Sequence, residues 1–390
     1  MYIKRDFEDI FAKTIRSRKV LVVYGSRQTG KTTVIEKLLE SPDIKRGGVL
    51  VLDGDIKAHR DLLNYQSITP ERVRSIVGKA KTFFIDEAQK ILDIGLTLKI
   101  IHDKLKDIHI VATGSSSFEL SEEVGEPLTG RMANYVLPPL SFTEIASATS
   151  SATEITALPA RLRLGSYPDV VTADSEADAI ETLGQLCESY LFKDVLKWQS
   201  VKNSEMLSKL LRALALQLGN EVSYKEVGDI VGIGNETVQA YVERLEKAFV
   251  LFRLPAFSRN ARNELKKSRK IYFYDTGVRN AILGNYLQLD CRDDTGHLFE
   301  NYLICERMKN NNVKRKRVSC HFWRTTSPAD GEIDYIEESS DGGISAYEFK
   351  MNPVKAAKAR PPARFAKTYP DAKWQVVSTD NYPAFVAGEM

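Results

Sequence analysis

The sequence predicts an α/β protein whose N-terminal part is built on a parallel sheet. Three observations support this. Short apolar runs typical of buried strands alternate with helical patterns, a glycine-rich loop follows the first run, and two carboxylates end a later one. Strands that alternate with helices form parallel sheets that are covered on both faces. Such sheets hold their ligands at the carboxyl ends of the strands, so we expect the site there.

The composition of the 390-residue chain indicates a globular protein of two or three domains. Hydrophobic residues make up 43% and charged residues 27%, and no apolar run approaches the length of a membrane span. The N-terminal residues contain no apolar block of signal-peptide length, so we expect a cytoplasmic protein without membrane contact. The four cysteines lack C-x-x-C spacing, which favours reduced thiols over disulfides or zinc. A net charge of +3 indicates no particular partner.

The loop after the first predicted strand has the spacing G-x-x-x-x-G-K-[ST]. The strand Val20–Tyr24 leads into it and a helical pattern follows it, which an ordinary glycine turn would not require. Inward-facing backbone N–H groups and the helix N-terminus make such a loop a phosphate cradle. Lys31 would reach the outer phosphates of ATP, and the Thr32 hydroxyl would ligate Mg²⁺. The predicted nucleotide-binding residues are Gly25, Ser26, Arg27, Gln28, Thr29, Gly30, Lys31, Thr32 and Thr33.

A second apolar strand ends in Asp86-Glu87, about fifty residues after the loop. We expect Asp86 in the Mg²⁺ shell and Glu87 next to the attacking water. Further strands are predicted at 48–52 and 108–114, and a helix at 7–16.

Two further residues are weaker candidates. Ser115 follows the strand 108–114 and would sense the γ-phosphate, although serines at such positions also cap helices. Arg131 would supply positive charge to the transition state, in its own chain or in a neighbouring subunit. A surface arginine without that role is an equal alternative, and action on a neighbouring subunit would require a homo-oligomer.

Several motifs together resemble the prokaryotic AAA-type P-loop ATPases that carry a C-terminal domain of unknown function. The motifs, which span nearly the whole chain, are Gly25–Thr32, Phe84–Gln89, Thr113–Phe118, Leu128–Arg131, Leu140–Glu144, Gly165–Pro168, Tyr190–Asp194, Gly296–Asn301 and Gly331–Asp334. The resemblance implies an AAA-like ATPase core, then a winged helix, then a restriction-endonuclease-like fold. We therefore expect an ATPase domain at 1–150, a helical region with a winged helix-turn-helix at 151–285, and a nuclease-like domain at 286–390.

The middle region contains a helix-turn-helix pattern. Residues 146–157 are small and polar, which is typical of a linker. Helical patterns at 222–231 and 235–249 flank a glycine turn, and strands at 250–254 and 270–274 would form a hairpin. The wing of this hairpin carries a basic cluster, which comprises Arg259, Arg262, Lys266, Lys267, Arg269 and Lys270. In a DNA-binding helix-turn-helix the second helix lies in the major groove, and its first residues face the bases. In this chain those residues are Asn235, Glu236, Thr237 and Gln239. A protein-docking role has equal weight, because Glu236, Glu243 and Glu246 would repel phosphate.

The C-terminal region carries an aspartate on one predicted strand, E-x-K on the next, and a glutamate on a preceding helix. This order resembles the PD-(D/E)xK nuclease core. The resemblance implies that Asp334 and Glu348 hold a metal, that Glu300 completes its shell, and that Lys350 orients water. Two alternatives remain open: solvated charges on a strand pair, or the same fold with an inert site. The basic stretch from residue 352 and the pattern 373–378 predict a helix and a last strand.

The sequence therefore predicts Mg²⁺-dependent ATP hydrolysis coupled to the binding or processing of nucleic acid, DNA in the first place. The alternative is a slow ATPase switch that docks a protein partner through its winged helix and an inert nuclease-like domain.

Overall fold

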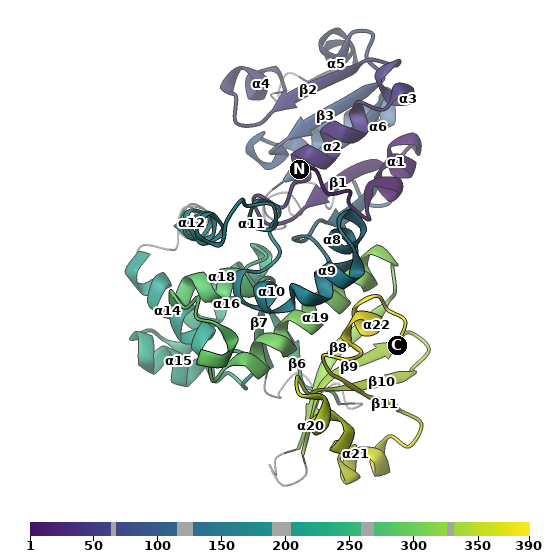
Figure 1. Cartoon of the computed structure of the whole chain (residues 1–390). Coiled ribbons are helices and arrows are strands. Elements are labelled where there is room, and N and C mark those ends of the chain that lie inside the picture. The colour runs from purple at the N-terminus through teal and green to yellow at the C-terminus, as the bar shows by residue number, and fades with distance from the viewer. Residues whose placement is uncertain (64–67, 115–127, 189–203, 259–268, 326–330) are drawn as a thin grey trace. The chain divides into compact units, whose positions relative to one another are not determined.

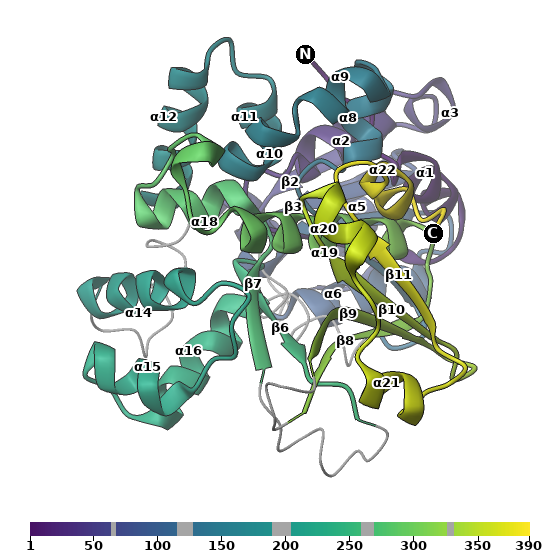
Figure 2. The ribbon, with the colours of Figure 1, turned by 60° about the horizontal axis from the view of Figure 1, so that its bottom comes forward.

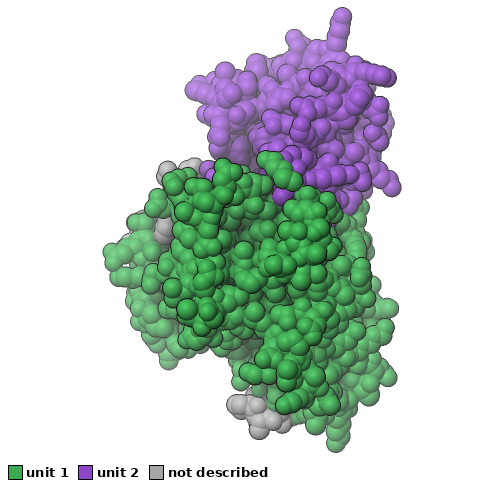
Figure 3. All heavy atoms as spheres, viewed as in Figure 1, with its two compact units in different colours: residues 1, 139–246, 250–390 green, residues 2–138, 247–249 purple. Residues whose placement is uncertain are grey.

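The chain forms two compact units in the computed structural model, which describes residues 1–63, 68–114, 128–188, 204–258, 269–325 and 331–390. Residues 2–138 and 247–249 make up the N-terminal unit, and residues 1, 139–246 and 250–390 make up the larger unit (Figure 3). Each unit is considered by itself. The expected domain boundaries at residues 150 and 285 stay predictions.

The N-terminal unit is an alternation of strands and helices, as predicted. Its strands are β1 (Val20–Tyr24), β2 (Val49–Asp53), β3 (Thr82–Asp86), β4 (His109–Gly114) and β5 (Met132–Val136). Its helices are α1 (Glu8–Arg16), α2 (Lys31–Leu39), α3 (Pro42–Lys45), α4 (Lys57–Leu62), α5 (Pro70–Val77) and α6 (Ile94–Lys104), with a 3-10 turn at Ala88–Lys90.

The strands of this unit form one parallel sheet, which within the described residues has the order β2-β3-β4-β1-β5 (Figure 1). Every residue of β1 is buried, because β1 lies inside the sheet between β4 and β5. The α/β class and the parallel sheet are thus confirmed. Strand β5 was not predicted, because Asn134 interrupts the apolar run in Met132–Val136.

The larger unit is mostly helical up to residue 313. Its helices in that part are α8 (Phe142–Ala148), α9 (Ser151–Thr156), α10 (Leu158–Leu164), α11 (Pro168–Val171), α12 (Glu176–Leu186), α14 (Ser204–Leu216), α15 (Tyr224–Val231), α16 (Asn235–Lys247), α18 (Thr276–Leu283) and α19 (Thr295–Val313), with a 3-10 turn at Leu289–Cys291. Within the described residues, β6 (Leu251–Pro255) and β7 (Arg269–Phe273) pair antiparallel as a two-stranded sheet.

The predicted linker is wrong in its secondary structure. Residues 146–157 contain the end of α8 and all of α9. Ser150 caps α9 through a hydrogen bond from the Thr153 N–H, at 3.0 Å. Glu154 is buried and accepts two hydrogen bonds from Arg161 of α10, at 2.7 and 3.1 Å. The Ser150 cap and the ion pair of the buried Glu154 with Arg161, seven residues along the chain, therefore stabilise this small, polar segment as a helix.

Helices α15 and α16 are joined by a tight glycine turn, and α14 lies beside α15 (Figure 2). Gly232 has φ +82°, the left-handed conformation that ends α15. A Cβ at Gly228 would lie 2.5 Å from the Ile233 carbonyl oxygen, so the turn packs directly on α15. These elements lie where the helix-turn-helix was predicted, while the winged-helix class itself stays a prediction.

The C-terminal part of the larger unit is a separate mixed sheet. Within the described residues, its order is β11-β10-β9-β8, with β8 (Val318–Arg324), β9 (Glu332–Ser339) and β10 (Ile344–Phe349) antiparallel and β11 (Lys373–Val377) parallel to β10. Helices α20 (Pro353–Lys358), α21 (Ala363–Thr368) and α22 (Tyr382–Val386) complete it. The nuclease-like fold stays a prediction.

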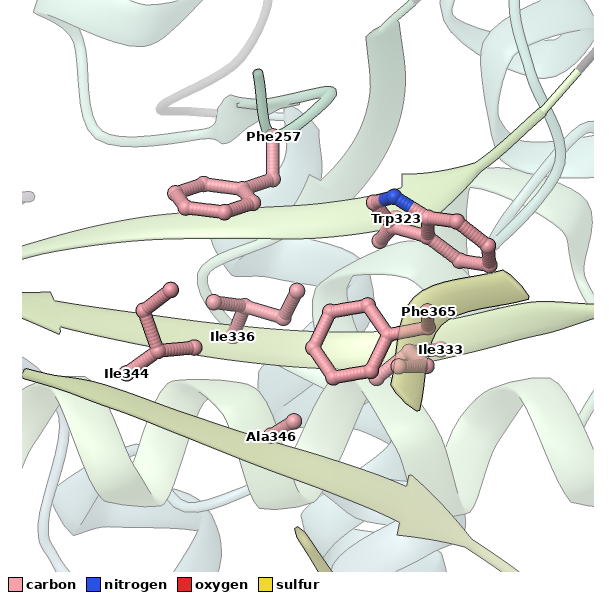
Figure 4. Close-up of a cluster of buried hydrophobic side chains, with 7 residues drawn as sticks. All are labelled: Phe257, Trp323, Ile333, Ile336, Ile344, Ala346 and Phe365. Atoms are coloured by element: carbon pink, nitrogen blue, oxygen red, sulfur yellow. The ribbon is translucent and has the colours of Figure 1, made fainter. Parts of the chain in front are cut away.

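One face of this sheet carries a hydrophobic cluster (Figure 4). Its members are Phe257, Trp323, Ile333, Ile336, Ile344, Ala346 and Phe365. Phe257 follows β6, and its N–H donates to the Phe322 carbonyl at 2.6 Å, so the two-stranded sheet continues into the C-terminal one. Ile333 and Ile336 share the face although they are three residues apart, because the pairing of β8 with β9 shifts between them. Asp334 lies in that shifted stretch.

No helix among the described residues is long and apolar enough to cross a membrane.

Candidate functional site

The glycine-rich loop follows β1 and ends at the start of α2. Gly25 has φ +147°, and a Cβ there would lie 2.3 Å from the Leu137 carbonyl oxygen, so only glycine fits. Gly30 has φ +85° and immediately precedes Lys31, the first residue of α2. The loop therefore lies at the carboxyl end of a buried strand and at a helix N-terminus, as the motif predicts.

Lys31 is buried against the loop itself. Its Nζ donates to the carbonyl oxygens of Gly25 and Ser26, at 2.9 and 2.8 Å. Thr29 braces the same turn by donating from Oγ1 to the Ser26 carbonyl at 2.9 Å. The ammonium is thus held inside the loop, where outer phosphates of a nucleotide would meet it.

Asp86 ends β3, and its carboxylate connects this strand to α2 and β4. The Thr32 hydroxyl donates to its Oδ2 at 2.9 Å, and the Thr113 hydroxyl at the end of β4 donates to its Oδ1. A hydroxyl and a carboxylate this close can share one Mg²⁺ ion, which prefers oxygen ligands and completes its shell with phosphates and water. The residues present therefore fit the ion that accompanies ATP.

Glu87 has a left-handed backbone, φ +46°, directly after the strand. Its Oε2 accepts a hydrogen bond from Gln89 Nε2 at 2.6 Å. Gly54, after β2, donates from its N–H to the Asp86 carbonyl at 2.9 Å, and a Cβ there would lie 2.2 Å from the Glu87 carbonyl oxygen. Gly54 and Gln89 thus fix the position of Glu87, and the sequence motif shows neither role.

Arg5 is a second residue that sequence reasoning missed. Its guanidinium donates to the Thr29 carbonyl at 2.7 Å and to the Pro138 carbonyl at 2.6 Å. It therefore joins the segment before α1 to the glycine-rich loop. No motif contains it, and the sequence does not indicate its burial, which Arg163, Arg279 and Arg307 share.

Arg131 does not lie near these groups. Its backbone carbonyl accepts from the N–H of Val20, where β1 begins, whereas the glycine-rich loop follows the other end of β1. Five strand residues separate the two edges by roughly 16 Å. Its guanidinium donates to Asp103 Oδ1 at 2.8 Å, and this bond together with His102 lowers the pKa of Asp103 to about 2. A role of Arg131 within its own chain does not fit, and a role in a neighbouring subunit stays a prediction.

Ser115, Tyr190–Asp194 and most of the basic cluster lie outside the described residues. Two described members of that cluster differ from the prediction of a solvated wing. The Arg269 guanidinium lies 4.6 Å from the centre of the Tyr224 ring. Lys270 is buried and forms ion pairs with Glu300 and Glu332.

The predicted nuclease residues do come together in the larger unit. Together with Glu332 they form an acidic cluster, comprising Glu300 on α19, Glu332 and Asp334 on β9, and Glu348 on β10. Burial raises the pKa of Asp334 well above its ordinary value, and the carboxylates of Glu300 and Glu348 raise it further. Burial would also raise the pKa of Glu300, but the ammonium of Lys270, His297 and the Tyr272 hydroxyl together outweigh it, and the pKa is lowered.

Each predicted metal ligand already has a partner within the protein. Asp334 Oδ2 accepts from the Phe349 N–H at 2.7 Å, and Glu348 Oε1 accepts from Lys350 Nζ at 2.5 Å. Glu300 accepts from Lys270 at 3.3 Å and from the Tyr272 hydroxyl. In the described parts of the chain, no three Asp, Glu, His or Cys side chains are grouped so that they could hold a metal ion. The arrangement of these carboxylates does not fit the metal ion that the resemblance to the PD-(D/E)xK nuclease core implied.

The parallel sheet, the glycine-rich loop and Asp86 at a neighbouring strand end define a P-loop nucleotide-binding domain. Family models agree, because residues 17–146 match the AAA domain. Residues 155–288 and 295–386 match two domains of unknown function, DUF8612 and DUF4143. The chain therefore contains an AAA-type P-loop ATPase domain at residues 17–146 and a C-terminal DUF4143 domain at residues 295–386.

Three similar proteins carry the description uncharacterised protein. A protein of Methanocaldococcus jannaschii is 24% identical over 80% of this chain and 74% of its own length. One of Haemophilus influenzae is 25% identical over 68% of this chain and 69% of its own length. One of Mycobacterium tuberculosis is 24% identical over 86% of this chain and 71% of its own length.

Two solved structures show a distant similarity. Aeropyrum pernix ORC1 in complex with DNA has a TM-score of 0.30 and 15% identity, with 73% of this chain and 93% of that chain covered. AMPPCP-bound DnaA from Aquifex aeolicus has a TM-score of 0.30 and 12% identity, with 68% of this chain and 92% of that chain covered. TM-scores this low support no inference about function.

Proposed function

We propose that the protein hydrolyses ATP at the glycine-rich loop in a reaction that needs Mg²⁺. The observation that carries this proposal is the convergence of Lys31, Thr32, Thr113 and Glu87 around Asp86 at the carboxyl edge of one parallel sheet. The reaction is in-line attack of water on the γ-phosphate, which releases ADP and phosphate.

Each group has one task in this reaction. Thr32 and Asp86 hold the Mg²⁺ that arrives with ATP. The Lys31 ammonium exchanges the loop carbonyls for phosphate oxygens and neutralises their growing charge. Glu87, held by Gln89, orients the water and accepts its proton.

Lys31→Ala tests the binding half of the proposal. Hydrogen bonds to charged groups contribute about 1.5–3 kcal/mol, so ATP affinity should fall roughly 10- to 100-fold, as equilibrium binding of a fluorescent ATP analogue would measure. Unchanged affinity would show that phosphates bind elsewhere.

We propose further that nucleotide turnover is coupled to nucleic acid, with DNA as the first candidate, through α15 and α16. Asn235, Glu236, Thr237 and Gln239 at the start of α16 are all exposed, as a helix that reads a groove requires. Addition of duplex or single-stranded DNA should then raise the steady-state rate of ATP hydrolysis.

The second candidate is a slow ATPase switch that docks a protein partner, and specific observations favour it. Gln239 donates to Glu243 at 3.0 Å, so one predicted base-reading side chain is already bonded to a carboxylate. Glu236 adds a negative charge at the start of the helix, and Arg269 and Lys270 of the basic cluster have internal partners. An ATPase rate that is indifferent to DNA would favour this candidate.

A further inference from the structure

Lys270 is a buried cation that reaches from β7 into the acidic cluster. Its side chain is only 4% exposed. The ammonium pairs with Glu300 of α19 at 3.3 Å and with Glu332 of β9. It also lies 5.3 Å from the centre of the Phe322 ring on β8. One charge thus contacts three elements that belong to different parts of the sequence.

Both oxygens of Glu300 already face groups of the chain. Its Oε1 accepts from Lys270 and from the Tyr272 hydroxyl. Its Oε2 lies 3.7 Å from His297 Nδ1. A Cβ at Gly219, whose φ is +73°, would lie 3.3 Å from the same Oε2, so the backbone closes that side.

The other carboxylates of the acidic cluster also have partners within the chain. Lys350 Nζ donates to Glu348 at 2.5 Å, and the Phe349 N–H donates to Asp334 at 2.7 Å. Arg324 lies 3.9 Å from the second oxygen of Glu332. Three cationic side chains and one backbone N–H of the chain therefore lie against the carboxylates from which a metal site would have to be built.

We propose that the ammonium of Lys270 is the resident cation of the acidic cluster and takes the place that a divalent metal has in metal-dependent nucleases. A buried carboxylate group needs a counter-charge, because an unpaired buried charge costs several kcal/mol. In this chain the counter-charge is covalently attached to β7. The cluster joins the two-stranded sheet to α19 and the C-terminal sheet without any metal, and a divalent ion would meet like charge there.

The test uses the full-length, nucleotide-free protein, stripped of metal with EDTA and then titrated with Mn²⁺. Wild type should show no saturable change in its thermal unfolding midpoint. Lys270→Met removes the ammonium but keeps a long apolar side chain. Its midpoint should fall in EDTA and should rise again, saturably, with Mn²⁺, because the ion enters the vacated position.

Lys309→Met is the matched control. Lys309 is also buried in the larger unit and pairs with Glu306 at 2.6 Å, outside the acidic cluster. This variant should lose stability but gain no response to Mn²⁺. Both variants keep the nucleotide site, so Mn²⁺ bound there would shift them equally. Equal responses of the two variants would overturn the proposal.

If Lys270→Met does not fold, calorimetric titration of wild type and Asp334→Asn with Mn²⁺ tests the proposal instead. Wild type and Asp334→Asn should give the same heats with Mn²⁺, because neither has a metal site in the cluster. Saturable Mn²⁺ binding by wild type that Asp334→Asn abolishes would overturn the proposal.

Discussion

Arg131 shows how a single residue changes its interpretation once the edges of the sheet are known. It lies where β1 begins, and its partner is Asp103. We therefore predict that Arg131→Ala lowers the free energy of unfolding by about 0.2–1 kcal/mol at neutral pH, the range for exposed ion pairs, and leaves the turnover number unchanged. A turnover number reduced tenfold or more would instead indicate a transition-state role in a neighbouring subunit.

The ion pair of Arg131 with Asp103 should also make stability depend on pH. The pKa of Asp103 is lowered from 3.8 to about 2 in the folded protein, so its contribution to stability is present above about pH 4. That contribution is lost as the pH falls towards 2. The difference in unfolding free energy between wild type and Arg131→Ala should therefore shrink over this interval, measured by denaturant titration at several pH values. A constant difference would contradict the assignment of the pair.

At Gly25 steric exclusion alone determines which residue the loop can hold. Gly25→Ala would place a methyl group 2.3 Å from the Leu137 carbonyl oxygen, so the loop must move. We predict at least roughly a tenfold loss of ATP affinity, equivalent to about 1.4 kcal/mol. Gly78→Ala is the control, because Gly78 also has positive φ, +60°, but has open space around it. It should cost stability without changing affinity.

At the scale of elements, α9 depends on a buried ion pair. Glu154 is 1% exposed and Arg161 is 12% exposed. Glu154→Ala leaves the arginine without its counter-charge and should destabilise the larger unit by about 3–5 kcal/mol. Lys209→Ala, which breaks an exposed pair with Glu205 on α14, should cost no more than about 0.5 kcal/mol. Thermal unfolding of both variants measures the contrast, and similar losses would contradict it.

The elements also show what a sequence can and cannot predict. The strands at 20–24, 82–86 and 109–114 were predictable because continuous apolar runs are typical of strands buried on both faces. Helix α9 was not predictable. Its Glu154 can be buried only because an arginine of the next helix pairs with it, and the sequence does not show that pair. The sequence alone places Lys270 in the basic wing, because the partners that bury it lie 30 and 62 positions away along the chain.

In the two candidate sites, too, residues that belong to local motifs were predictable, and residues that act through contacts distant in the sequence were not. The glycine-rich loop and Asp86 carry local motifs, so their places at the strand ends were predictable. Gly54 acts through packing and lies in no motif, and Gln89 ends the motif Phe84–Gln89, which does not indicate its hydrogen bond to Glu87. In the acidic cluster the residues were predictable, but the ammonium among them was not.

For the whole molecule, the nature of the partner is the open choice between the two proposed functions. If phosphates contact the middle region, DNA affinity should fall steeply as salt rises, because each contact releases counterions. Fluorescence anisotropy of labelled duplex at several salt concentrations measures this slope. Affinity that does not depend on salt, together with an ATPase rate unaffected by DNA, would favour a protein partner.

The central claim is that the chain turns over ATP with Glu87 as the group that activates water. The most direct test is ATP hydrolysis by Glu87→Gln next to wild type, together with the amount of ATP that each retains. Loss of a general base typically costs 10²- to 10⁴-fold, so we predict turnover reduced at least about 100-fold with ATP still bound. Wild-type turnover by Glu87→Gln would contradict the account.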